Sequence, residues 1–65
     1  MPRFVFAAAR DGDMLLDHLD AADPDAATEV ALDAAREYHS LECDNDQIEC
    51  ELDGFAIQPL DDTTT

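Results

Sequence analysis

The hydrophobic residues at the start of the chain follow the two-residue period of a β-strand. Residues 3–10 read RFVFAAAR, so both the even-numbered and the odd-numbered positions carry apolar side chains. The two phenylalanines share one face with Ala8, and Val5, Ala7 and Ala9 share the other. A strand that is apolar on both faces is typical of the centre of a sheet.

A hairpin is expected directly after this strand. The Asp-Gly pair at positions 11 and 12 is a favoured two-residue turn because glycine tolerates positive φ, and residues 13–19 can then return antiparallel. The resulting register gives the pairs Ala8–Leu15 and Phe4–Leu19. It also places Asp17 opposite Phe6, so a short helix over residues 13–20 stays open as the alternative.

A helix is predicted from residue 24 onward. Asp23 can cap the backbone N–H groups of the first turn, Pro24 suits the first helical position, and Asp25 adds negative charge at the positive end of the dipole. The helix is expected to end at Tyr38 or His39. One arc of its surface is apolar and consists of Ala27, Val30, Ala31, Ala34, Ala35, Tyr38 and Leu41. The opposite arc holds Asp25, Glu29, Asp33, Arg36 and Glu37.

A second hairpin is predicted after a polar loop over residues 40–47. The chain there reads IECELDGFAIQPL, in which an Asp-Gly pair at positions 53 and 54 separates two alternating runs. The expected register pairs Leu52 with Phe55 and Cys50 with Ile57, and it leaves one apolar face, which also includes Ile48, for the helix. Pro59 ends this hairpin or marks an edge position.

These elements predict the α+β class. The order β-β-α-β-β is typical of a small domain in which one amphipathic helix packs on an antiparallel sheet. We expect a single domain over residues 1–60 and a polar C-terminal tail over residues 61–65. A chain of this length buries only about 60% of its unfolded surface, so self-association through the first sheet or an exposed edge is expected to supplement a thin core.

Charge adds a condition to this fold. Seventeen Asp and Glu stand against three Arg and no Lys, which gives a net charge of −14. At a separation of ~15 Å in water, the resulting repulsion sums to on the order of 25 kcal/mol, more than the ~5–15 kcal/mol stability of a typical domain. In 1 M salt the Debye length is about 3 Å, so most of this repulsion is screened. The composition therefore predicts adaptation to concentrated salt, and it resembles that of proteins from salt-accumulating halophilic archaea.

The same charge limits the partners. Nucleic-acid binding relies on Lys and Arg, and Arg3, Arg10 and Arg36 are too few and too scattered for it. Anionic membrane surfaces are disfavoured for the same reason, and the longest apolar run, residues 4–9, is too short for a transmembrane helix or a signal peptide. We expect a cytoplasmic protein that binds neither nucleic acid nor membrane, with solvent cations at its acidic surface.

The candidate metal ligands are His39, Cys43 and Cys50, with His18 as a fourth. Their spacing, H-x3-C-x6-C, lacks the tight C-x2-C pair that zinc favours. Both cysteines are expected to be free thiols, with Cys50 packed as a small apolar side chain and Cys43 near a loop. Residues 44–46 (DND) begin like a calcium loop, but the obligatory glycine is missing. No metal and no cofactor is therefore assigned, and a small metal-binding protein stays an alternative.

Enzymatic activity is not expected. The closest arrangement to a nucleophile is Cys43 near His39 at a helix C-terminus, which raises the pKa of a thiol and opposes activation. The two glycines both fall in predicted turns, which excludes a glycine-rich phosphate loop. We assign no catalytic residue and no cofactor-binding residue.

Two stretches resemble known groups. The opening MPRFVF…RDGD, followed by the helix AATEVALDAAREY, resembles small bacterial proteins that begin MPRYFF-x-x-RDG, a group that implies no activity. The strand–strand–helix order with DPDAATEVALDAARE is similar to HicB-type antitoxins, whose helix follows G-D-T-x-x-E-A-L. Glu29, Val30, Ala31 and Leu32 fit that pattern loosely, whereas the family's P-x-L-P-G-C segment is missing. This resemblance implies a regulator that binds a basic partner protein.

Together these observations favour a non-enzymatic protein–protein interaction module or homodimer. An antitoxin-like regulator is the alternative that the HicB resemblance implies, and a metal-binding protein is the third hypothesis.

Overall fold

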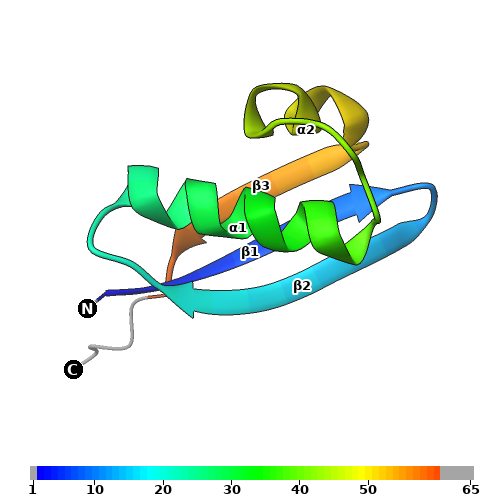
Figure 1. The fold of residues 1–65 in the computed structure, drawn as a ribbon. Coiled ribbons are helices and arrows are strands. Elements are labelled where there is room, and N and C mark those ends of the chain that lie inside the picture. The colour runs from blue at the N-terminus through cyan, green and yellow to red at the C-terminus, as the bar shows by residue number, and fades with distance from the viewer. Residues whose placement is uncertain (1, 61–65) are drawn as a thin grey trace.

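The computed structural model describes residues 2–60, which form one three-stranded sheet and two helices. The elements are β1 (Arg3–Arg10), β2 (Asp13–Asp20), α1 (Pro24–Tyr38), α2 (Asn45–Glu51) and β3 (Gly54–Pro59). The sheet is antiparallel with strand order β2-β1-β3, and both helices lie on one of its faces (Figure 1). The predicted α+β class, with an amphipathic helix packed on an antiparallel sheet, is confirmed. The predicted tail at residues 61–65 lies outside the described residues.

The first hairpin forms in the predicted register. Ala8 faces Leu15 and Phe4 faces Leu19, and the turn residues Asp11 and Gly12 both have positive φ, at 53° and 86°. The alternative of a helix over residues 13–20 is wrong, because β2 continues to its end at residue 20. Asp17 does lie opposite Phe6, but β2 is an edge strand, so the carboxylate is exposed to solvent.

Helix α1 begins and ends where the sequence predicts. The Asp23 side chain accepts a hydrogen bond of 2.8 Å from the backbone N–H of Ala26, and Pro24 occupies the first helical position. The buried residues, however, are Ala27, Ala31, Leu32 and Ala35. Val30 and Tyr38, which were predicted to be covered, are 46% and 52% exposed. The helix is rotated toward Leu32 because this large side chain packs against α2.

The predicted second hairpin is wrong, and the order is β-β-α-α-β. Residues 45–51 form helix α2, and Gly54 opens β3, which pairs with β1. The physical reason is that β1 paired with β2 alone leaves the backbone N–H and C=O groups of its other edge without partners, and Gly54–Pro59 pairs with that edge. Ile48 and Leu52 lie four residues apart and are both buried, whereas Cys50 between them is exposed. The apolar residues alternate as in a strand, but Ile48 and Leu52 are also spaced as an i,i+4 pair on one side of a helix.

The core lies between the helices and one sheet face, called here the covered face. Its buried residues are Phe4, Phe6, Ala8, Ala21, Ala27, Ala31, Leu32, Ala35, Ile48 and Leu52, and half of these are alanine. The folded chain exposes 4351 Å². An extended chain of this mass exposes roughly 10,300 Å², so folding removes only about 58% of the surface. The core is therefore thin for a domain that must fold alone.

Candidate functional site

The face of the sheet opposite the helices is the candidate site, and we call it the open face. The β-register places eleven side-chain positions on it, contributed by Arg3, Val5, Ala7, Ala9, Met14, Leu16, His18, Asp20, Gly54, Ala56 and Gln58. Within residues 2–60, no helix or strand covers these positions. Seven of the eleven are apolar or glycine, and one, Asp20, is acidic. At one end of the face, Arg3 and Asp20 form an ion pair at 3.0 Å.

The open face has a ridge beside a trough. Met14 and Leu16 on β2 form the ridge, and their side chains are 59% and 68% exposed. The neighbouring positions on β1 and β3 hold only small residues, Ala7, Ala9, Gly54 and Ala56, and these form the trough. A hollow of about 220 Å³ lies beside Leu16, over Ala7 and Ala56. The relief arises because β2 carries long side chains where its two partner strands carry methyl groups or hydrogen.

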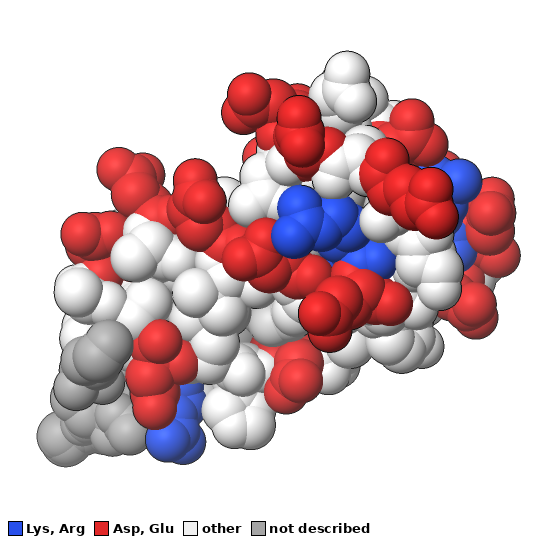
Figure 2. Space-filling model, viewed as in Figure 1, with Lys and Arg blue, Asp and Glu red and all other residues white. Residues whose placement is uncertain are grey.

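The carboxylates are distributed around the rest of the molecule. The described residues contain fifteen of the seventeen acids, since Asp61 and Asp62 are outside them, and all fifteen are exposed. Figure 2 shows them over the helix side of the molecule, with white and blue patches between them. A protein of net charge −14 thus has one sheet face on which the register places a single acidic side chain, Asp20, in an ion pair with Arg3.

Both edges of the sheet disfavour strand addition. The β2 edge carries Asp13, Asp17 and Asp20 within eight residues. The β3 edge is a six-residue strand that ends at Pro59, which has no backbone N–H to donate. Charged residues, proline and short strands are the features by which natural sheets prevent edge-to-edge pairing. Because both edges disfavour pairing with another strand, a partner that binds the sheet is expected to contact its open face.

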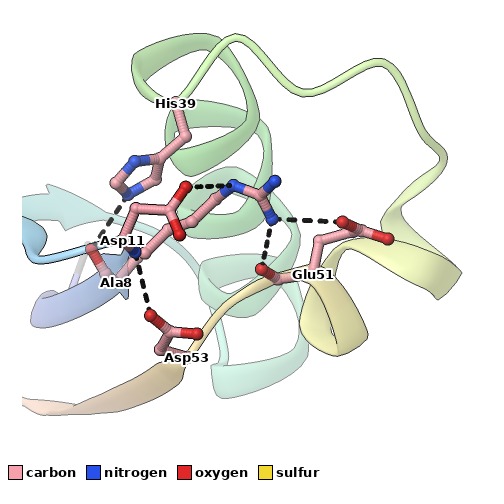
Figure 3. A network of polar contacts seen from close by, with 6 residues as sticks. Ala8, Asp11, His39, Glu51 and Asp53 are labelled. Atoms are coloured by element: carbon pink, nitrogen blue, oxygen red, sulfur yellow. Dashed lines mark hydrogen bonds and ion pairs between the residues drawn. The ribbon is translucent and has the colours of Figure 1, made fainter.

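The arginines connect elements of the fold. Arg10, at the end of β1, donates to the backbone carbonyl of Glu51 at 2.6 Å and to its carboxylate at 3.1 Å, and it lies 3.8 Å from Asp11 (Figure 3). The Asp11 N–H donates to the Asp53 carboxylate at 2.9 Å. These contacts fasten the end of α2 to the first hairpin.

Arg36 has the same role at the other end of α2. It pairs with Asp33 at 2.9 Å and donates to the side-chain oxygen of Asn45 at 3.0 Å and to the backbone carbonyl of Cys43 at 3.4 Å. Arg3 forms the ion pair with Asp20 at one end of the open face. All three arginines of the chain are thus engaged with neighbouring acceptors, and the sequence's scattered basic residues are not gathered into one patch.

The candidate metal ligands do not converge. One ring nitrogen of His39, Nε2, lies 3.2 Å from the Ala8 carbonyl oxygen, and His18 lies on the open face beside Asp17. Among residues 2–60, no three His, Cys, Asp or Glu side chains are close enough together to hold a metal ion. The described structure therefore gives the metal hypothesis no support.

Of the two cysteine predictions, the one for Cys43 is confirmed and the one for Cys50 is wrong. Cys43 lies in the loop before α2, as predicted, but it is partly buried against the core cluster of Leu32 and Ile48. Cys50, predicted to pack, is exposed. The correction follows from the helical conformation of residues 45–51. It also removes the calcium-loop interpretation of residues 44–46, because Asp44 is the N-cap of α2 and the next two residues lie in its first turn.

Comparison with known proteins finds no matching family model, and no curated protein or solved structure is significantly similar. Neither resemblance drawn from the sequence gains support from this comparison. Within the part of the chain that the structure describes, neither helix has the length and apolarity needed to cross a bilayer.

The sequence predicted dimerisation through the first sheet or an exposed edge, but it did not identify the open face, although the pattern of this face was present in the sequence. Residues 3–10 are apolar on both faces, but the predicted helix can cover only one. Met14 and Leu16 continue the second apolar face into β2 in the predicted register. The sequence did not show where β3 lies in the sheet, because the predicted second hairpin did not specify which strand pairs with β1.

Proposed function

We propose that this chain is a non-enzymatic protein–protein interaction module of a salt-rich cytoplasm, and that it forms a homodimer through the open face. The observation that carries the proposal is that the open face holds a single carboxylate, Asp20, which is paired with Arg3 at one end, in a chain with a net charge of −14. Exposed apolar surface bordered by polar residues is typical of interaction sites. The ridge of Met14 and Leu16 supplies that surface here.

Charge determines when two copies can meet. Fourteen charges opposite fourteen form about 196 pairs, and at ~25 Å in water each pair repels by ~0.17 kcal/mol, so the unscreened sum is on the order of 30 kcal/mol. Contact through the open face directs both helices, with their carboxylates, away from the partner. In about 1 M salt the Debye length of ~3 Å screens the remaining repulsion. The dimer is therefore a high-salt species.

The apolar contact is modest by comparison. Three strands ~4.8 Å apart and about 17 Å long present roughly 240 Å² per copy. Burying both copies contributes on the order of 12 kcal/mol at ~25 cal/mol/Å², and association costs ~4–15 kcal/mol. Repulsion of ~30 kcal/mol exceeds this gain at low salt. When repulsion is screened, we expect a weak dimer, with a Kd on the order of 100 μM.

A salt titration tests the proposal. KCl is raised from about 0.01 M, where the Debye length is ~30 Å, to 1 M and above. Circular dichroism follows helix content, and static light scattering follows mass at protein concentrations above the expected Kd. We expect both to rise with KCl. Tetramethylammonium chloride at equal ionic strength is the control, because screening predicts the same response and specific potassium binding does not. A folded monomer whose helix content and mass are the same at every salt concentration would contradict the proposal.

A further inference from the structure

This inference rests on the proposed function. We propose that the two copies of the dimer are related by a two-fold axis parallel to β1. In this arrangement, Leu16 of each copy inserts into the hollow over Ala7 and Ala56 of the other copy. The hollow measures about 220 Å³. An apolar cavity of about 150 Å³ is sufficient for a benzene molecule, so the space accommodates a leucine side chain. The same face thus carries both the projecting group and the space that receives it.

The sheet order selects this axis. β1 is central, with β2 on one side and β3 on the other. A two-fold rotation about an axis parallel to β1, lying between the two sheets, exchanges left and right and therefore places β2 of one copy over β3 of its partner. Positions along the strands are preserved, and Leu16, Ala7 and Ala56 form one row across the sheet. Leu16 thereby faces the partner's Ala56.

A two-fold axis perpendicular to the strands gives the opposite result. That axis places β2 of one copy over β2 of its partner. The two ridges of Met14 and Leu16 then contact each other, and the two troughs stay apart. Packed sheets lie about 10 Å apart with interdigitating side chains, which ridge-on-ridge contact prevents. The resulting voids would leave Ala7 and Ala56 without contacts across the interface. Isologous contact of ridge with trough fills both hollows at once.

Chemical cross-linking distinguishes the two arrangements. Leu16→Cys and Ala56→Cys are made as separate chains in a Cys43→Ala/Cys50→Ser background, so that no native thiol reacts. The chains are mixed in about 1 M KCl and treated with a two-carbon bismaleimide, because facing residues of packed sheets are too far apart for a direct disulfide. Separate chains avoid a cross-link within one copy. The background chain without added cysteine is the control, and circular dichroism verifies folding.

We expect the mixture to form cross-linked dimer several-fold faster than Leu16→Cys alone. Faster reaction of Leu16→Cys alone would show ridge-on-ridge packing and overturn the arrangement. If light scattering shows a dimer but neither sample cross-links, the arrangement is wrong while the proposed function stands. If light scattering shows only monomer in all KCl concentrations, both the arrangement and the proposed homodimer are wrong.

Discussion

The two faces of β1 are both apolar, but only one is packed within the chain. On the covered face, Phe4, Phe6 and Ala8 are at most 4% exposed, and Phe4 and Ala8 belong to core clusters that include residues of α1 or α2. On the open face, those from Val5 to Ala9 are half-buried by their neighbours in the sheet alone. The difference shows that apolar alternation identifies which residues avoid water but not what covers them.

The faces also differ in how acidic residues are arranged around them. On β2, Asp13 and Asp17 alternate with Leu15 on the side of the helices, where an edge strand still gives carboxylates access to water. The open-face positions Met14 and Leu16 hold no charge. A strongly acidic chain therefore tolerates carboxylates at the border of its core, while its open face holds only Asp20, which is paired with Arg3 at one end. This contrast agrees with the proposed interface in concentrated salt, because apolar contact persists when charges are screened.

The largest expected effect compares one substitution on each face. Phe6→Ala removes a ring that is 3% exposed on the covered face, and we expect a loss of about 3–5 kcal/mol in the free energy of unfolding. Leu16→Ala on the open face should change it by no more than ~0.5 kcal/mol. Urea unfolding in about 1 M KCl, at protein concentrations below the expected Kd, measures both. Equal losses would mean that the open face also contributes to the monomer core.

The second prediction concerns how α2 completes the covered face. Ile48 is fully buried, so Ile48→Ala should lower the free energy of unfolding by about 2–5 kcal/mol. Cys50→Ala, at an exposed position two residues later, should change it by less than ~0.5 kcal/mol. The same urea experiment compares the two variants. Similar losses at both positions would favour a strand over residues 48–52 and contradict the helix.

An exchange of large and small residues examines the open face. Ala56→Leu fills the trough and Leu16→Ala removes the ridge, and each should raise the dimer Kd roughly tenfold, which corresponds to ~1.4 kcal/mol. The double variant moves the ridge from β2 to β3, so we expect its Kd to recover toward the wild-type value. Sedimentation equilibrium in concentrated KCl measures the Kd. Ala22→Leu, at an exposed position outside the sheet, is the control. Additive losses in the double variant would argue against the ridge-and-trough contact.

The smallest expected effect comes from the start of the covering helix. Asp23→Ala removes the cap hydrogen bond to Ala26 and should cost about 1 kcal/mol of unfolding free energy. Asp25→Ala removes charge from the same turn without removing the cap, and should cost about 0.3–0.5 kcal/mol. Both variants should leave the dimer Kd unchanged, because the helix lies on the face opposite the interface. An altered Kd for the Asp23 variant alone would imply that α1 takes part in association.

The first forty residues of the fold could be predicted because their signals are local. The Asp-Gly turn fixes the register of β1 and β2, and Asp23 with Pro24 fixes the start of α1. The rotation of α1 was not predictable in the same way. Its apolar arc is mostly alanine, so the position of one large residue, Leu32, determines which side is buried. That position depends on α2, which follows later in the sequence.

The error over residues 48–58 has a different cause. Apolar residues at positions 48, 50 and 52 satisfy the period of a strand, but the first and last of them also satisfy one helical turn. The choice between these is made by tertiary contacts, because β1 requires a second partner strand and β3 supplies it. The open face became visible as a site only with this pairing, which places Ala56 beside Ala7.

The most direct test of the open face compares two additions of the same charge. Leu16→Glu places a carboxylate on the open face, and Val30→Glu places one at a comparably exposed position on α1. Light scattering in about 1 M KCl and above measures the mass of each variant. We predict that Leu16→Glu is monomeric at concentrations where wild type and Val30→Glu are dimeric, while all three have the same helix content. A Leu16→Glu protein that dimerises as wild type does would contradict the assignment of this face as the interface.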